Sequence, residues 1–173
     1  MTIGWIGSPS TWKYVRPLLP LLSELCTKHK VVFRAVGAGI GAVADRFPHM
    51  ELGEWSEETE VPELQRFDLG IMPVVYDPWG RGKSGYKLIQ YMACGVPVVA
   101  SPVGVNCDLI NDHENGFLAA TVGEWRDAIE RLLGDSDLRA SLGQAGRTRA
   151  TAEFSLRVYS PRLIEMIRSA AGG

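Results

Sequence analysis

Glycine, serine and lysine residues gather in one short stretch near the middle of the chain. The segment Gly82-Lys83-Ser84-Gly85 follows an apolar run and precedes a helical pattern, and Lys87 comes soon after it. The spacing of Lys83 and Lys87 predicts that both lie on one face of that helix, near its positive end. Two cations at this end repel each other and destabilise the helix unless an anion binds there. The stretch therefore indicates a phosphate-binding site more than a solvated basic face.

The same stretch partly matches the phosphate-binding loop of ATPases. The complete motif requires another glycine earlier in the loop, where this sequence has Asp77. No later apolar strand ends in an aspartate that would bind magnesium. An ATPase is therefore disfavoured. Trp79, at the tip of the loop, either anchors the loop or forms a wall of the site.

A second glycine-rich segment, Gly37 to Ala42, matches the dinucleotide-binding fingerprint. Glu57 stands at the distance where the ribose-binding acid of that motif is expected. However, the segment follows the second predicted strand, whereas the fingerprint belongs after the first strand of its unit. We therefore interpret it as a glycine-rich turn, and a nicotinamide-dependent enzyme is disfavoured.

The composition indicates an ordinary globular chain. Of its 173 residues, 46% are hydrophobic and 22% are charged, which suits one α/β domain with a full core. A net charge of −2 argues against a nucleic-acid-binding protein. The histidines and cysteines lack the spacing of a metal site or a disulfide framework, which predicts no metal and reduced thiols in a cytoplasmic protein. These residues are His29, His49, His113, Cys26, Cys94 and Cys107.

Strands and helices alternate along the chain, and they must position these residues. Buried strands are predicted at 2–6, 31–36, 50–52, 68–73, 96–101 and 116–120. Helices are predicted in the later part of 14–29 and at 42–47, 62–67, 86–94, 124–133, 137–148 and 160–170. An acidic loop is expected at 54–62, a long loop at 74–85 and a left-handed helix cap at Gly95. This alternation predicts a single Rossmann-like α/β domain over 1–173, with a parallel sheet covered by helices on both faces.

The run from Asp68 to Asn106 resembles the donor-binding half of a known enzyme family. Its pattern is a strand, a loop, a glycine-opened helix ending in Met-Ala-Cys-Gly, and then Pro-Val-Val-Ala with a glycine turn. The segments 3–8, 115–118 and 153–155 are similar to further landmarks of the same domain. The family is the retaining glycosyltransferases of the GT-B fold, group 1, which are glycogen-synthase-like. The resemblance implies a C-terminal, nucleotide-sugar-binding domain whose N-terminal acceptor domain is absent from this chain.

The resemblance also implies roles for residues in the loop after the first strand. In the family, a glycine, an arginine and a lysine of this loop hold the diphosphate. Gly7 matches the glycine, Ser8 stands in place of the arginine, and Lys13 matches the lysine. This chain therefore keeps one of the two expected cations.

Two acidic residues that are typical of the family are replaced here. By the resemblance, the acid that holds the sugar falls at Gly82, and the acid that holds the ribose falls at Gln90. An amide hydrogen-bonds a ribose diol as acceptor and donor, so Gln90 keeps that role. Gly82 cannot replace a carboxylate, and we expect Asp77 to take over.

The loop that leads into the helix is a variant of the family pattern. The resemblance implies that the backbone N–H of Gly85 faces phosphate. The Gly-Lys-Ser-Gly-Tyr-Lys loop is similar to that of a bacterial glycan-assembly subgroup, in which Lys83 and Lys87 supply positive charge. Ser84 and Tyr86 complete this expected substrate-binding segment.

The resemblance implies the function. We expect the full-length protein to transfer a sugar, with retention, from a nucleoside-diphosphate sugar such as a UDP- or GDP-sugar to a glycan or lipid-linked acceptor, without a metal or another cofactor. No catalytic residue is assigned within this chain, which we expect to be inactive alone. A GT-B sugar-nucleotide epimerase and a non-catalytic nucleotide-binding module are the alternatives.

The last predicted helix carries an apolar stripe. In the family this helix commonly crosses back to the N-terminal domain, so its stripe lacks that partner here. We expect it either to repack on its own domain or to form a homodimer, and peripheral membrane association of the full-length enzyme is also considered. The stripe consists of Leu163, Ile164, Met166 and Ile167.

Overall fold

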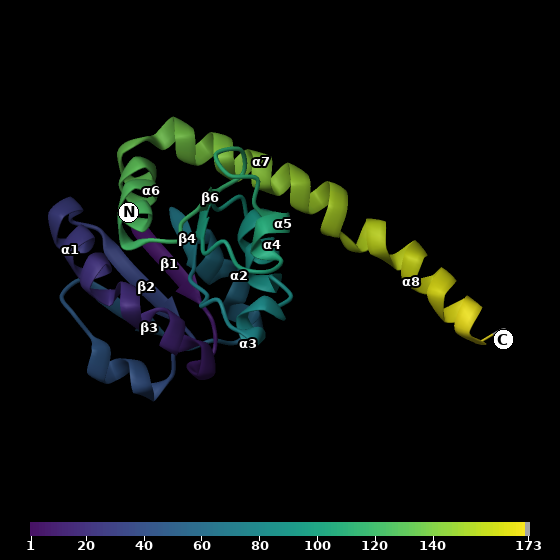
Figure 1. The fold of residues 1–173 in the computed structure, drawn as a ribbon, viewed down its shortest axis with the longest axis horizontal. Coiled ribbons are helices and arrows are strands. Elements are labelled where there is room, and N and C mark those ends of the chain that lie inside the picture. Colours follow the sequence, from purple (N-terminus) through teal and green to yellow (C-terminus); the bar gives the residue numbers. More distant parts are fainter. Residues whose placement is uncertain (172–173) are drawn as a thin grey trace.

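Six parallel strands form one sheet at the centre of the fold (Figure 1). The structure, a computed structural model, describes residues 1–171. The strand order is β3-β2-β1-β4-β5-β6, so the winding direction reverses between β1 and β4. Open α/β sheets bind ligands at such a switch point. The strands are β1 (Thr2–Ile6), β2 (Val32–Val36), β3 (Met50–Gly53), β4 (Leu69–Met72), β5 (Val98–Ala100) and β6 (Phe117–Leu118).

The central strands are apolar throughout because both faces of the sheet are covered. Every residue of β4 and β5 is buried. Within β5, Val99 packs into the core on one face, and its neighbours Val98 and Ala100 pack into the core on the other. This alternation is the ordinary period of a strand. The Rossmann-like parallel sheet is therefore confirmed.

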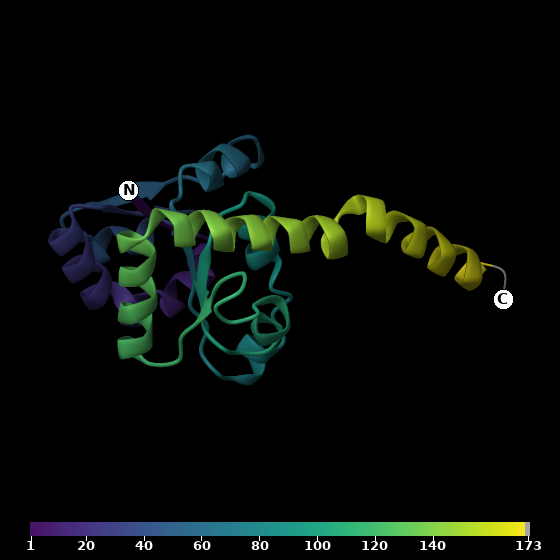
Figure 2. The same ribbon diagram turned by 90° about the horizontal axis from the view of Figure 1, so that it is seen from above.

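Helices cover both faces of the sheet (Figures 1 and 2). On one face lie α1 (Leu19–His29) and α6 (Val122–Gly134), and on the other lie α2 (Glu57–Gln65) and α4 (Tyr86–Ala93). Helix α7 (Ser136–Phe154) crosses between them, because Leu142 packs into the first core and Ala150 into the second.

Several predicted boundaries were wrong. The expected acidic loop at 54–62 is largely helix α2, because Ser56 caps the helix by accepting from the Thr59 amide and acidic residues fill the first turn. Pro62 lies inside this helix rather than at its start. The expected long loop contains the short helix α3 (Pro78–Arg81), and α5 (Asn106–Leu109) was not predicted. The segments η1 (Pro9–Tyr14), η2 (Arg16–Leu18) and η3 (Ile40–Asp45) are 3₁₀-helices.

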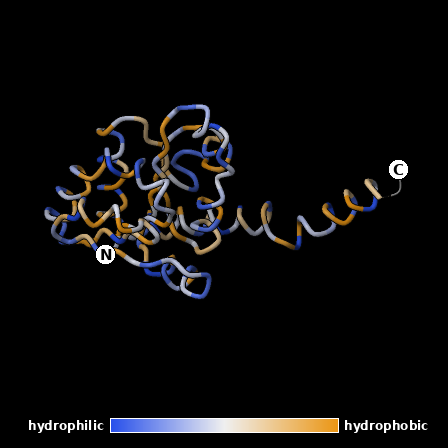
Figure 3. The backbone as a smooth tube through the Cα atoms, turned by 90° about the horizontal axis from the view of Figure 1, so that it is seen from below, coloured by the Kyte–Doolittle hydropathy of each residue, from blue (hydrophilic) through white to orange (hydrophobic). Residues whose placement is uncertain are grey.

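Helix α8 (Leu156–Ala171) continues beyond α7 and extends away from the sheet and its covering helices (Figure 2). None of its described residues is buried. Hydrophobic and hydrophilic residues alternate along it (Figure 3), and Leu163 and Ile167 are 57% and 59% exposed. The expectation that the stripe repacks on its own domain was therefore wrong, since the helix has no surface of this domain beneath it. The homodimer stays a prediction.

Candidate functional site

Segments that follow β1 and β4 meet at the switch point of the sheet. The first is η1, which carries Lys13, and the second runs from α3 into α4, which carries Lys87. Buried Trp12 anchors η1: its indole N–H donates to Asp45 at 2.7 Å. A cavity of about 380 Å³ is lined by the end of β4 and by the second segment. Its lining consists of Met72, Pro78, Trp79, Gly82, Lys83, Ser84, Gly85, Tyr86 and Lys87.

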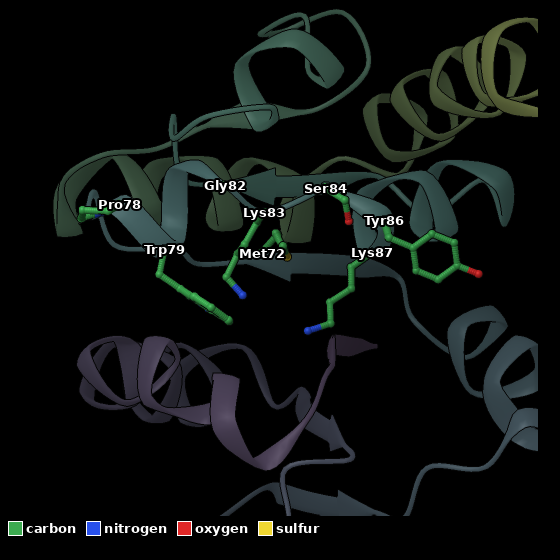
Figure 4. A pocket seen from close by; sticks show the side chains of 9 residues that line it. Met72, Pro78, Trp79, Gly82, Lys83, Ser84, Tyr86 and Lys87 are labelled. Atoms are coloured by element: carbon green, nitrogen blue, oxygen red, sulfur yellow. The ribbon is translucent and has the colours of Figure 1, made fainter. Parts of the chain in front are cut away.

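Three lysines converge beside this cavity, which we call the lysine cavity. Figure 4 shows the side chains of Lys83 and Lys87 pointing toward the N-terminal segment, drawn in purple. The Lys87 Nζ lies 5.4 Å from the centroid of a Trp5 ring and donates to Thr11 Oγ1 at 3.4 Å. The Nζ atoms of Lys13 and Lys83 each lie 5.0 Å from the Tyr14 ring centroid. Across residues 1–171, no ion pair joins any of these lysines to an acid.

The lysine charges are unfavourable in the ligand-free chain. Burial, and next the charge of Lys83, lowers the pKa of Lys87 to about 8. Burial, and next the charge of Lys13, also lowers the pKa of Lys83, while Asp77 acts in the opposite direction. An anion bound in the cavity would supply the missing counter-charge and raise both pKa values. The site is therefore suited to a multiply charged anion such as a diphosphate.

Gly85 places the start of α4 against the cavity. Its φ of 67° is left-handed, and a Cβ there would lie 2.4 Å from Leu109 Cδ1. Glycine is therefore required at this N-cap. The first turn of α4 has amides without intrahelical acceptors, and Gly85, Tyr86 and Lys87 of this segment line the cavity. Lys83 precedes the helix by a turn, so the prediction that both lysines lie on one helix face was wrong, although their ammonium groups still converge.

Two loop residues behave differently from each other. The Asp77 side chain caps α3 by accepting from the Gly80 amide, so it serves its own loop. It does not line the cavity, and the structure gives no support to the expectation that it replaces the acid missing at Gly82. Trp79 is 72% exposed and lines the cavity, so it forms a wall rather than a buried anchor.

A larger cavity of about 710 Å³ opens at the ends of β1, β2 and β3. The glycine-rich turn from Gly37 forms part of its rim, with Ile40 and Val43 as exposed apolar walls. Trp55, which follows β3, lies on the other side and is half-exposed. An apolar cavity with an indole on one wall suits a flat aromatic ring, and we call it the aromatic cavity.

A third cavity, of about 200 Å³, connects these two. It shares Tyr86 and Lys87 with the lysine cavity, and Gly7, Ser8 and Trp55 with the larger one. Its other lining residues are Ile6, Glu60 and Gln90. The Ser8 hydroxyl, which lies just before η1, forms hydrogen bonds with the Ser10 and Thr11 hydroxyls of η1. Gln90 and Glu60 therefore place polar groups in the space between the lysine cavity and the aromatic cavity.

Sequence reasoning missed Thr11, Trp55 and Glu60. Only Trp55 carried a usable signal, since it follows a predicted strand at the carboxyl edge of the sheet. Within residues 1–171, no cluster of His, Cys, Asp and Glu has the arrangement of a metal site. None of the helices described for these residues is long and apolar enough to cross a membrane.

The doubly wound sheet, with cavities at the carboxyl ends of its strands beside the switch point, defines an α/β protein of the kind that places ligand sites at this edge. The family model of glycosyl transferases group 1 matches residues 1–135. The chain therefore belongs to the group 1 glycosyltransferases. This is the family that the run from Asp68 to Asn106 resembles, so the family predicted from the sequence is confirmed.

Two curated relatives show how much of a full-length enzyme this chain represents. The D-inositol 3-phosphate glycosyltransferase of Corynebacterium jeikeium is 27% identical and aligns with 93% of this chain and 42% of its own length. The sucrose synthase of Melioribacter roseus is also 27% identical and aligns with 86% of this chain and 18% of its own length. The chain thus spans less than half the length of these relatives.

Solved structures share the fold. The sucrose-phosphate synthase of Thermosynechococcus elongatus superposes with a TM-score of 0.82 at 21% identity, over 99% of this chain and 45% of that one. Anabaena HepE, in complex with UDP and glucose, gives a TM-score of 0.79 at 20% identity, over 97% of this chain and 48% of that one. The C-terminal domain of a Francisella tularensis group 1 protein gives 0.65 at 18% identity and is covered over 86% of its length. The architecture is that of a GT-B C-terminal domain.

Proposed function

We propose that this chain binds the nucleoside-diphosphate sugar donor of a glycosyl transfer reaction. The observation that carries the proposal is the order of the three connected cavities. Lys83 and Lys87 line the first, Gln90 and Glu60 line the second, and Trp55 borders the third. A nucleoside diphosphate has the same order, with anionic diphosphate, hydroxyl-bearing ribose and aromatic base. HepE, which shares this fold, is in complex with UDP, and this favours UDP over GDP as the nucleotide here.

The lysines act on the leaving group. Transfer breaks the bond between the anomeric carbon and a diphosphate oxygen, and negative charge develops on that oxygen. Lys83, Lys87 and Lys13, with the amides at the start of α4, neutralise this charge without a metal ion. Because they are fixed before the reaction, they need little reorganisation as the bond breaks.

The rest of the reaction belongs to the part of the enzyme that this chain does not contain. The chain spans 48% of HepE and has a glycine rather than an acidic residue at position 82. We infer that the acceptor and the groups facing the sugar come from the other half of the enzyme. The full-length protein is then a retaining transferase acting on a bacterial glycan or lipid-linked acceptor in the cytoplasm.

A thermal-shift panel of UDP-, GDP-, ADP- and dTDP-sugars tests the donor proposal. A ligand at roughly 100 times its dissociation constant adds about 2.7 kcal/mol to the free energy of unfolding. We expect at least one sugar nucleotide to raise the melting temperature, with UDP-sugars ahead. The free sugars, which lack the diphosphate, serve as the control. A panel without any shift at millimolar ligand contradicts the proposal.

A further inference from the structure

Glu60 joins two side chains from different parts of the fold. The Trp55 indole N–H donates to Glu60 Oε2 at 2.7 Å, and the Gln90 amide donates to Glu60 Oε1. Glu60 lies in α2 and Gln90 in α4, and both line the 200 Å³ cavity between the lysines and the aromatic cavity. One carboxylate therefore connects a wall of the aromatic cavity with the polar group of the middle one.

The chemistry of Glu60 decides how Gln90 is oriented. An ionised carboxylate only accepts hydrogen bonds, so Gln90 must turn its NH₂ group toward Glu60. Its carbonyl oxygen is then the group that it offers to the cavity. A glutamine held in this way presents an oxygen acceptor, as a carboxylate would. Hydroxyl groups donate to such an acceptor, and a hydrogen atom in place of a hydroxyl cannot.

We propose that Glu60 is the positioning residue for ribonucleoside recognition. It fixes the Gln90 carbonyl to accept from a ribose hydroxyl, and it fixes the Trp55 indole beside the base. This inference rests on the proposed function, because it concerns the nucleoside half of the same ligand. It assigns the selectivity for ribose over deoxyribose to a residue outside the loop and helix that carry the lysines.

A purely structural role for Glu60 is the competing explanation. Glu57, Glu58 and Glu60 all lie in the first turn of α2, where acids stabilise the helix. Glu58 bonds within its own turn, which lowers its pKa. Of the three acids, Glu60 is the one that a side chain of α4, Gln90, contacts by a hydrogen bond within residues 1–171. Glu57 therefore provides a matched control that removes the same charge from the same turn.

The experiment measures two affinities by calorimetry on the 173-residue chain. One is for whichever of UDP, GDP and ADP the chain binds most tightly, and the other is for its 2′-deoxy counterpart. The variants are Glu60→Gln, Glu57→Gln, Gln90→Glu and the exchange Glu60→Gln with Gln90→Glu. Inorganic pyrophosphate reports on the lysine cavity alone, and thermal denaturation reports on folding.

We expect Glu60→Gln to weaken ribonucleotide binding about three- to tenfold and to bring the ribose-to-deoxyribose ratio close to unity. Pyrophosphate binding stays constant, and Glu57→Gln changes neither the ribonucleotide affinity nor the ribose-to-deoxyribose ratio. Gln90→Glu alone places two carboxylates in contact and weakens binding, and the exchange restores discrimination because one carboxylate and one amide face each other again.

Two results overturn the inference while the proposed function stands. One is an unchanged ribose-to-deoxyribose ratio in folded Glu60→Gln, and the other is a failure of the exchange variant to recover discrimination although it folds. If the wild-type chain binds pyrophosphate but no nucleotide, or binds neither, the proposed function itself fails and the inference fails with it.

Discussion

Replacing Lys87 with methionine should strengthen the fold and weaken ligand binding. Methionine keeps much of the side-chain length, so it retains the contact with Trp5 and removes the charge. In the ligand-free chain, lowering the Lys87 pKa from 10.5 to about 8 corresponds to roughly 3 kcal/mol against the charged form. Because this side chain is partly exposed, we expect a gain of about 1–3 kcal/mol in the free energy of unfolding at pH 7.

Binding should change in the opposite direction. A hydrogen bond between a charged group and its partner contributes about 1.5–3 kcal/mol, so Lys87→Met should lower affinity for UDP about ten- to a hundredfold. Affinity for uridine, which has no phosphate, should stay within about twofold. Isothermal calorimetry with both ligands and thermal denaturation measure the two effects on the same samples.

The pH dependence follows from the lowered pKa. Between pH 8 and 10.5 the unfolded chain holds the Lys87 proton and the folded chain releases it. The stability advantage of Lys87→Met over wild type should therefore be full below pH 8 and shrink as the pH rises toward 10.5. A bound anion raises the pKa of Lys87, so wild-type affinity for UDP should be constant from about pH 7, above which the terminal phosphate is ionised, to pH 8 and should fall above pH 8.

Lys28→Met is the matched control. Lys28 is an exposed lysine of α1 that pairs with Glu130 at 2.6 Å. Removing it takes the same charge from the chain, costs at most about 1 kcal/mol and leaves UDP binding unchanged. If Lys87→Met keeps wild-type affinity for UDP, the lysine cavity is not a diphosphate site. If the variant instead lowers stability, the argument that the buried Lys87 charge is unfavourable is wrong.

Three further predictions concern other parts of the chain. Gly85→Ala should destabilise the fold by about 1–3 kcal/mol in urea denaturation, because of its left-handed φ and the close approach of Leu109; stability equal to wild type would contradict the N-cap geometry. The isolated chain should bind nucleotide without multiple-turnover transfer. A radiolabelled sugar assay that finds turnover would contradict the expectation that transfer needs the acceptor-binding half of the enzyme. The chain should form a concentration-dependent homodimer that Leu163→Glu abolishes, as measured by analytical ultracentrifugation; a monomer at all concentrations would contradict it.

The strands were predictable because burial on both faces leaves a continuous apolar run. β1, β4 and β5 follow that rule, and each was predicted to within two residues at either end. Gly95 was predictable as a helix cap, and its φ of 71° is left-handed. Helix α2 was not, because its acidic composition is equally typical of a loop, and a single capping bond from Ser56 decides between the two.

The candidate site was predictable only in part. Lysines and glycines at a strand-to-helix junction carry a local signal, so the cavity around Lys83 and Lys87 was found. Asp77 was assigned to the sugar because it lies nearby in the sequence, whereas its carboxylate caps α3. Glu60 reaches Gln90 across two helices, and no spacing along the chain records that contact. Tertiary contacts between distant segments are what the sequence alone does not supply.

The exposure of the cavity walls explains why this domain should bind its ligand weakly by itself. Trp79 and Tyr86 border the lysine cavity and are 72% and 62% exposed, and Ile40 on the larger cavity is 91% exposed. A nucleotide held by these walls keeps one side in water, where a lysine–phosphate contact is weakened by salt. An opposing domain that covers this side would exclude water and strengthen the same contacts. Under the proposed function, we therefore expect the lysines to bind the diphosphate weakly in this chain alone and to act fully on the leaving group only when an opposing domain covers them.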